Sequence, residues 1–350
     1  MMKSNIFTKI CTLFFSVMAV LSPFQNSAQI YAAENNKLSN HCQCLKKVAI
    51  GTGCGVLSMA AIATGGHIYK NSDNFFQSYV IGSYLNPPSP DLLKDVDFED
   101  IDFTEINIDN KLRGYEYKAQ SGTVSDCLKG KYVIFYSGSG CSNTMQISEV
   151  LGFYTSKGAT VIGVDYHGFG KGDEKVPRGK VRQSSIYSDA EKIYKYVVNH
   201  YHVKNSNILL HGYSLGGPVA AHVAATFSNK DNKFCGLILQ SSMKNTLNAA
   251  YTVLTRQDRG LCMRILGSAA GYLFADSFDC EKELKKLYQK DPGIKISVCG
   301  GNENDHLNLQ LTKLDVFLKN YGFKNIISYN GPFSHSSKFC SAPRANFVFT

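Results

Sequence analysis

Strand-length apolar runs alternate with segments of helical spacing from residue 131 onward, and this alternation constrains the fold more than any other feature. The continuous apolar runs have the length and composition of buried parallel strands and occupy residues 131–136, 159–166, 207–213, 236–241, 294–299 and 326–329. Apolar residues at helical spacing occupy residues 142–157, 188–200, 216–227 and 306–321. A hairpin is indicated by the alternating runs 103–108 and 112–119 around Asp109-Asn110. The sequence therefore predicts a mainly parallel sheet with helices on both faces and a ligand site at the carboxyl ends of its strands.

The segment His211-Gly-Tyr-Ser-Leu-Gly-Gly217 contains the pattern G-x-S-x-G between a predicted strand and an Ala-rich predicted helix. Ser214 is expected on a tight strand-to-helix turn, where glycines two residues to either side avoid collisions. Such a turn exposes Oγ and places the N–H of Leu215 where it can bind an oxyanion. A buried serine in an ordinary turn is the competing interpretation. The glycine patterns of nucleotide-binding loops do not occur in this segment.

Serine is a poor nucleophile at neutral pH without a general base. His335 follows the last predicted strand in Gly331-Pro-Phe-Ser-His335, where a loop can carry the imidazole back over Ser214. A surface histidine in a polar loop is the alternative interpretation. His306 is a rival base, but its place at the start of a helix before the last strand fits less well.

The loop after the predicted strand 294–299 reads GGNENDH and carries the candidate acids. Asp305 is the predicted triad acid and Glu303 the reserve, and one of them would hold the tautomer of His335 and stabilise its imidazolium. A second oxyanion donor is predicted in the turn SGSGC after the strand 131–136, from the N–H of Ser139. A glycine-rich turn without a catalytic part is the alternative there.

With these motifs in place, the chain resembles the α/β-hydrolase superfamily over residues 103–335. More narrowly, it resembles membrane-associated ABHD-type serine hydrolases, which include acyl-protein thioesterases. The resemblance is carried by YVIFYSGSG, GVDYHGFGKGD, SDAEKIYKYV, LLHGYSLGGPVAAHVAA and the approach to the acid loop over 278–301. It implies an α/β-hydrolase fold and hydrolysis of an ester or thioester. Two departures are Ser137-Gly138, where the family usually has His-Gly, and an acid loop longer than the usual Gly-x-x-Asp.

The segment from Met243 to Pro292 separates two predicted strands and is expected to form a short lid or cap between the strands near 240 and 295. Its apolar stretch 261–274 (LCMRILGSAAGYLF) is predicted to contribute an acyl pocket. Plain packing of one helix on the sheet is the alternative.

The first part of the chain has features of export and membrane association. Residues 1–33 resemble a signal peptide, with an uncleaved anchor as the alternative. Residues 34–96 are predicted to be an apolar or membrane-associated segment and linker, and 97–350 the catalytic domain. Within this segment, 48–69 contains no Asp, Glu, Lys or Arg and is long enough to span a bilayer. A glycine-rich helix lying on the domain or on a membrane surface is equally compatible.

Composition limits the kinds of partner and cofactor that are expected. The formal net charge is +9, but the lysines are scattered, which indicates at most a weak attraction to membrane surfaces and no nucleic-acid site. The 11 cysteines permit disulfides without specifying any pairing. Cys42 and Cys44, beside Lys46 and Lys47, are either palmitoylation candidates or else ordinary thiols or a local disulfide. Together with His41 they are too close-set for a tetrahedral metal site, and no metal or cofactor is predicted.

The sequence therefore predicts an exported or membrane-associated serine hydrolase that forms an acyl-enzyme on Ser214. Its expected substrate is a carboxylic ester or thioester of a lipid or an S-acylated protein. A catalytically silent binding or scaffold protein with the same fold is one alternative. A serine peptidase is another, although no sequence feature suggests recognition of a peptide terminus.

Overall fold

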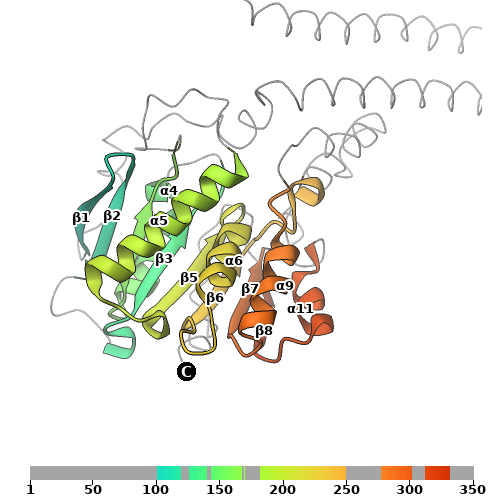
Figure 1. Cartoon of the computed structure of the whole chain (residues 1–350). Coiled ribbons are helices and arrows are strands. Elements are labelled where there is room, and N and C mark those ends of the chain that lie inside the picture. Colours follow the sequence, from blue (N-terminus) through green and yellow to red (C-terminus); the bar gives the residue numbers. More distant parts are fainter. Residues whose placement is uncertain are drawn as a thin grey trace, which may run out of the picture. The chain divides into compact units, whose positions relative to one another are not determined.

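The computed structural model describes residues 101–119, 126–139, 143–167, 169, 182–249, 277–301 and 312–331. They build one eight-stranded sheet in the order β1-β2-β4-β3-β5-β6-β7-β8 (Figure 1). The strands are β1 (Ile101–Ile108), β2 (Leu112–Ala119), β3 (Tyr132–Tyr136), β4 (Thr160–Val164), β5 (Ile208–Tyr213), β6 (Gly236–Gln240), β7 (Ile296–Gly300) and β8 (Ile326–Asn330). Strands β3 to β8 pair in parallel, whereas β1 with β2 and β2 with β4 pair antiparallel. The predicted mainly parallel sheet is confirmed.

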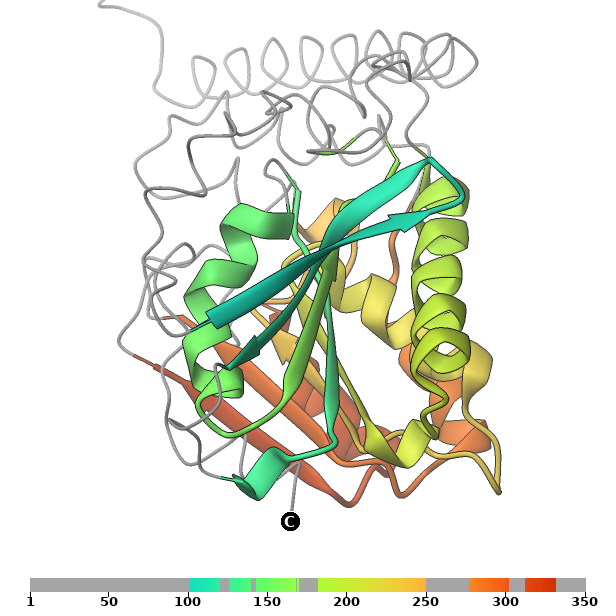
Figure 2. The same ribbon diagram turned by 90° about the vertical axis from the view of Figure 1, so that its left-hand side faces the viewer.

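Helices cover both faces of the sheet, as predicted. They are α4 (Asn143–Thr155), α5 (Gln183–Tyr201), α6 (Gly216–Phe227), α9 (Cys280–Lys290) and α11 (Leu314–Tyr321), and two short 3-10 turns lie at Asp126–Leu128 and Asn205–Asn207. Helix α4 lies on one side of the sheet and α5 on the other (Figure 2). Apolar residues of α5, α6, α9 and α11 share one core cluster, and those of α4 belong to a second cluster. Every residue of β5 and β6 is buried, because both faces of these strands are covered.

The predicted hairpin of β1 and β2 is also confirmed. Its turn residues Asp109 and Asn110 have φ angles of 54° and 56°. Two consecutive left-handed residues are typical of the tight hairpin turns that match strand twist, and Asp and Asn tolerate this conformation better than most residues. The local sequence therefore specifies both the turn and the register of the two strands.

Two helices depart from their predicted bounds, and a third was not predicted. Helix α5 starts at Gln183, before the predicted 188, and its first turn is closed by a hydrogen bond from the Arg182 N–H to Ser185 Oγ at 3.0 Å. The leucine spacing over 306–321 predicted a longer helix, but Lys313 has a φ of +50° and α11 begins after it. Helix α9 was not predicted separately. Asp279 accepts a hydrogen bond from the Lys282 N–H at 2.9 Å and caps its first turn.

Helix α9 lies in the segment predicted to form the lid or cap. Its apolar residues Cys280, Leu284 and Leu287 join the same core cluster as α6, so this part of the segment is packed into the domain. The stretch 261–274, predicted to contribute an acyl pocket, lies outside the described residues. Residues 1–100 also lie outside them, so the predicted signal peptide, the segment 34–96 and the boundary at 97 stay predictions.

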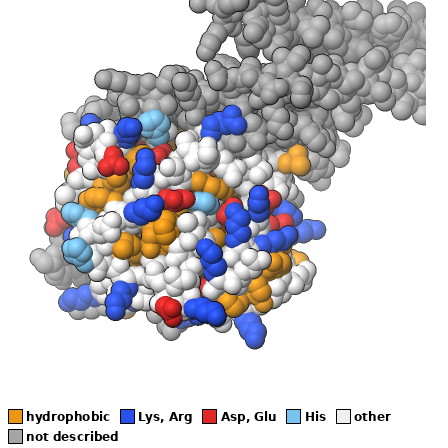
Figure 3. Space-filling model, in the orientation of Figure 1, with side chains coloured by type: hydrophobic (Ala, Val, Ile, Leu, Met, Phe, Trp, Pro, Cys, Tyr) orange, Lys and Arg blue, Asp and Glu red, His pale blue; other side chains and the backbone are white. Residues whose placement is uncertain are grey.

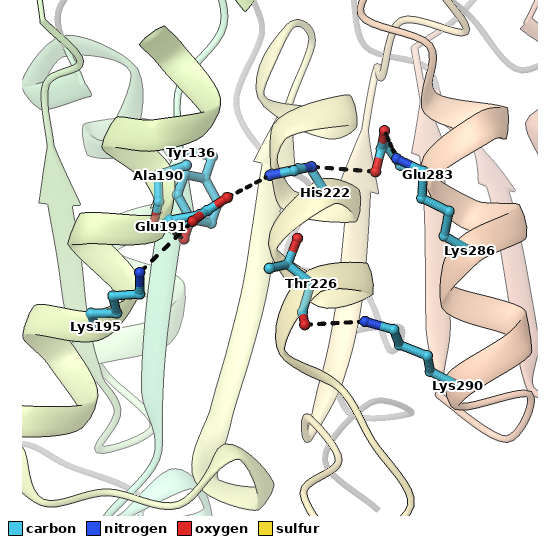
Figure 4. A network of polar contacts seen from close by, with 9 residues as sticks. All are labelled: Tyr136, Ala190, Glu191, Lys195, His222, Thr226, Glu283, Lys286 and Lys290. Carbon is cyan, nitrogen blue, oxygen red and sulfur yellow. Dashed lines mark hydrogen bonds and ion pairs between the residues drawn. The ribbon is translucent and has the colours of Figure 1, made fainter. Parts of the chain in front are cut away.

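A polar network on the outer side of α6 joins three helices (Figure 4). His222 of α6 has Nε2 3.0 Å from Glu191 Oε1 of α5 and Nδ1 3.3 Å from Glu283 Oε2 of α9. Lys286 Nζ lies 2.8 Å from Glu283 Oε1, and the His222 ring stacks on Tyr187 with centroids 4.0 Å apart. Burial acts to raise the pKa of the Glu283 carboxyl, but hydrogen bonds from His222 and Lys286 outweigh it and hold that pKa below its ordinary value of 4.5.

Glu283→Gln is expected to lower the free energy of unfolding by about 1 kcal/mol near pH 7, because it removes the charge from a buried, charge-assisted cluster. A carboxyl with a lowered pKa in the folded state stabilises the fold above its ordinary pKa, and this contribution is lost as pH falls through the folded-state value. Urea unfolding should therefore show the two proteins converging below about pH 4. Glu281→Gln is the control, since its half-buried ion pair with Lys244 predicts a change within about 0.5 kcal/mol. A difference for Glu283→Gln that persists undiminished at low pH would contradict this account.

Lysine and arginine side chains are spread over the face formed by α5, α6 and α9, between separate apolar patches (Figure 3). The described helices include none that combines the length and apolar character needed to cross a bilayer. The predicted membrane-spanning segment 48–69 lies outside the residues to which this finding applies.

Candidate active site

Ser214 occupies a tight turn between β5 and α6. Its φ angle is +53°, a left-handed conformation that costs a non-glycine residue about 1–2 kcal/mol. Its N–H donates to the carbonyl of Gln240 at 2.9 Å, and its own carbonyl accepts from the N–H groups of Gly217 and Met243, both at 3.1 Å. The predicted strained strand-turn-helix is therefore present, and neighbouring segments hold it in place.

The glycines on either side of Ser214 are required by close backbone approach. A Cβ at Gly212 would lie 2.7 Å from Gly217 Cα. A Cβ at Gly216 would overlap the carbonyl oxygen of Tyr136 and lie 2.8 Å from that of Ser137. The end of β3 thus packs directly on the first turn of α6, which explains physically the glycine spacing seen in the sequence.

The loop after β3 lies against the Ser214 turn. A Cβ at Gly138 would be 2.9 Å from Ser214 Cβ, so Gly138 permits this contact. Ser139 follows Gly138 and is exposed, whereas Leu215 is buried at the start of α6 in helical conformation. N–H groups at the start of a helix have no partner within the helix. Ser137-Gly138 stands where the resembled hydrolases usually have His-Gly, and Gly138 permits the close approach of this loop to Ser214.

A second loop braces the loop after β3. Tyr166, just after β4, is fully buried and donates from Oη to the Ser137 carbonyl at 3.4 Å. Phe169 packs edge-on against Tyr166 with ring centroids 5.5 Å apart. The His167 N–H donates to Asp189 Oδ2 of α5 at 2.8 Å. Burial raises the pKa of the Asp189 carboxyl, and the hydrogen bond from His167 partly offsets this rise. Tyr166, held by Phe169 and by the anchored backbone of His167, therefore supports the position of Ser137.

The candidate acids Asp305 and Glu303, the candidate base His335 and its rival His306 lie outside the described residues. The structure does show where their loops begin. Strand β7 ends at Gly300 and β8 at Asn330, and the Gly331 N–H donates to the Gly300 carbonyl at 3.0 Å. Both loops start at the edge of the sheet where Ser214 lies. Strand β7 lies two strands from β5, or about 10 Å, and β8 lies three strands from β5, or about 14 Å. The five residues after Asn330, ending at His335, could reach about 16 Å if fully extended, which is enough to span this distance.

Sequence reasoning assigned no role to His211, which the structure places in a buried polar chain. His211 Nδ1 lies 2.9 Å from Tyr154 Oη, and Nε2 lies 2.8 Å from Gln240 Oε1. Burial lowers the pKa of His211 to about 3, although the hydrogen bond to Gln240 acts in the opposite direction. The motif HGYSLGG shows His211 in the sequence, but nothing in one sequence identifies its partners on another strand and a helix.

Comparison with solved structures identifies the fold. An alpha-beta hydrolase from Vibrio vulnificus superimposes with a TM-score of 0.57 at 24% identity, over 77% of this chain and 87% of that one. A bacterial heroin esterase superimposes with a TM-score of 0.52 at 13% identity, over 73% of this chain and 85% of that one. This protein has the α/β-hydrolase fold.

Comparison of sequences matches part of this chain to a hydrolase family. The profile of a hydrolase family described as "Serine aminopeptidase, S33" matches residues 131–298. The multifunctional-autoprocessing repeats-in-toxin of Vibrio vulnificus is 31% identical over 189 residues. That match covers 53% of this chain and 3% of the toxin, so the chain spans a small part of this relative's length. The narrower resemblance to membrane-associated ABHD-type hydrolases is not confirmed by these matches.

Proposed function

We propose that this protein is a serine hydrolase that cleaves a carboxylic ester or thioester through an acyl-enzyme on Ser214. The observation that carries the proposal is the Ser214 turn, a non-glycine residue at a φ of +53° with the Gly138 loop packed against it. A turn of this kind, between a buried strand and a helix, presents a serine Oγ at the carboxyl edge of the sheet. The match of residues 131–298 to a serine hydrolase family supports the same chemistry.

In the proposed reaction, His335 accepts the proton of Ser214 Oγ as the oxygen attacks the acyl carbon. The carbonyl π electrons move onto the carbonyl oxygen, which the N–H groups of Leu215 and Ser139 stabilise. When the tetrahedral intermediate collapses, the bond to the leaving alcohol or thiol breaks, and His335 returns the proton to that group. Asp305, or Glu303 in its place, holds the imidazole and stabilises its charged form.

Water then attacks the acyl-enzyme by the same route. His335 accepts a proton from the water, the oxyanion forms again, and its collapse releases the carboxylic acid while Ser214 regains its proton. The neutral His211 takes no part in proton transfer, since burial holds its pKa near 3.

We further propose that the acyl group is apolar, as in a lipid ester or an S-acylated protein, and that the protein is exported or membrane-associated. The apolar stretches 48–69 and 261–274 motivate both statements. The description of the matching family as a serine aminopeptidase favours a second candidate, cleavage of a peptide or aminoacyl amide. Ser214 would have the same role in that reaction, and only the acyl donor would differ.

Labelling with a fluorophosphonate probe tests the nucleophile, with purified wild type compared with Ser214→Ala. We expect labelling of the wild type alone. A panel of short-chain and long-chain acyl esters, acyl thioesters and aminoacyl amides then tests the substrate class, and we expect the highest kcat/KM with long acyl chains. Preference for aminoacyl amides would favour the peptidase. A folded wild type that neither reacts with the probe nor hydrolyses any of these substrates would favour the catalytically silent scaffold.

A further inference from the structure

A polar chain crosses the apolar core between the sheet and α4, next to the Ser214 turn. It runs from Tyr154 in the last turn of α4, through His211 on β5, to Gln240 at the end of β6. Tyr154 and His211 are fully buried, and Gln240 is 2% exposed. The surrounding core cluster is apolar and includes Val133, Phe135, Leu209 and Ile238. Polar groups in such surroundings are costly unless they are hydrogen-bonded, so loss of either hydrogen bond of this polar chain would be unfavourable.

Within this polar chain, the hydrogen bonds are all donated in the same direction, from Tyr154 through His211 to Gln240. A neutral imidazole has one N–H donor and one acceptor nitrogen. Because Gln240 Oε1 can only accept, Nε2 of His211 carries the hydrogen, and Nδ1 accepts from the Tyr154 hydroxyl. The burial that lowers the pKa of His211 to about 3 keeps the imidazole neutral at physiological pH, so the direction does not change there.

One end of the polar chain contacts the Ser214 turn, and the other end lies on the helix that follows the candidate oxyanion loop. The backbone carbonyl of Gln240 accepts the N–H of Ser214 at 2.9 Å, while its side chain is held by His211. Gln240 also pairs in register with Tyr213, the residue before the nucleophile. At the other end, Tyr154 belongs to α4, the helix that follows the loop containing Gly138 and Ser139. The polar chain therefore links the Ser214 turn, through β5 and β6, with α4, the helix that begins after the loop containing Gly138 and Ser139.

We propose that Tyr154, His211 and Gln240 are positioning residues for acyl transfer, an inference that rests on the proposed function. They hold the Ser214 turn in register with the oxyanion loop and do not touch the substrate. Attack on an acyl carbon requires the nucleophile and the oxyanion donors to be placed together, and a misplacement of about 1 Å can reduce a rate by about a hundredfold. A side-chain link between two parallel strands and a helix limits such misplacement.

The test measures ester hydrolysis by Tyr154→Phe and Gln240→Met, which remove hydrogen-bonding groups and nearly preserve volume. We expect each to lower kcat about tenfold and to change KM by less than about twofold, since placement affects the transition state more than substrate binding. Tyr194→Phe is the matched control. It removes another buried tyrosine hydroxyl, which donates to Asn205 Oδ1 at 2.7 Å, and Tyr194 packs against Phe227 at the opposite end of α6. We expect Tyr194→Phe to lower Tm by a similar amount and leave kcat unchanged within about twofold.

The double variant Tyr154→Phe/Gln240→Met tests whether the two residues act through one chain. We expect its kcat to be about tenfold below wild type, because either single change already breaks the connection through His211. Fully additive losses, which would lower kcat about a hundredfold, would show that the two residues do not act through one polar chain. If Gln240→Met does not fold, the comparison of kcat between Tyr154→Phe and Tyr194→Phe is sufficient to test the positioning role. Equal kcat for these two variants, in an active wild type, would overturn the positioning role and leave the proposed function intact. A wild type without turnover or probe labelling would refute the proposed function and this inference together.

Discussion

Ser214→Ala is expected to reduce kcat for ester hydrolysis by at least about a thousandfold, because loss of a serine nucleophile leaves only the contributions of the oxyanion donors and substrate binding. KM should change little, since Oγ contributes most after the substrate has bound. The measurement is steady-state hydrolysis of the best ester from the substrate panel, after circular dichroism has shown that the variant is folded. Retention of more than about a tenth of wild-type kcat would assign the nucleophile to another residue.

The same position offers an independent test of the strained turn. Ser214→Gly removes the Cβ from a residue with a φ of +53°, whereas Ser214→Ala keeps it. We therefore expect Ser214→Gly to be more stable than Ser214→Ala by about 1 kcal/mol, although both are inactive. Thermal unfolding of the two variants measures this difference. Equal stability would show that the left-handed conformation stores no strain.

Gly216→Ala is expected to lower the free energy of unfolding by at least about 3 kcal/mol, or to prevent folding. The new Cβ would overlap the backbone carbonyl of Tyr136, and this contact cannot be relieved by a side-chain rotation. Either the end of β3 or the first turn of α6 must move, and these segments adjoin the Gly138 loop and the Ser214 turn, respectively. Soluble yield and urea unfolding provide the measurement.

Gly152→Ala is the matched control for this prediction. Gly152 lies in α4 on the exposed surface, and a Cβ there would meet nothing within 4 Å. Alanine is the better helix former, so this variant should be more stable by about 0.5–1 kcal/mol. If the two variants had similar stability, the close approach of β3 to Gly216 would not be what requires glycine.

Much of the central sheet can be predicted from the sequence because its determinants are local. The buried strands β3, β5 and β6 are continuous apolar runs, and the glycines around Ser214 indicate the tight turn before α6. The hairpin of β1 and β2 is specified by Asp109-Asn110. These signals lie within a few residues of the structures they determine, so one sequence is sufficient to identify them.

Other features depend on contacts that a single sequence does not reveal. Helix α9 presents a narrow apolar stripe of Leu284 and Leu287 among charged residues, and its burial depends on α6. The His211 contacts join residues 57 and 29 positions away along the chain, and they form because α4 packs on the sheet and β5 and β6 are neighbours in it. Asp305 follows β7 and His335 follows β8 in the sequence, and these two strands end beside each other in the sheet, but the choice between Asp305 and Glu303 depends on side-chain geometry that sequence order does not specify.

The burial of α6 has a consequence for synthesis of the protein on the ribosome. Nearly all of this helix is buried, with its apolar residues packed among the sheet, α5 and α9. Helix α9 begins at Cys280, so α6 leaves the ribosome about 50 residues before one of its covering helices, an interval of roughly 3–10 s at ordinary elongation rates. During this interval the alanine-rich and valine-rich surface of α6 lacks that cover and is available to chaperones or to other nascent chains. Release of stalled chains ending between residues 230 and 280 should therefore yield aggregation-prone intermediates, whereas chains extended beyond α9 should bury this surface.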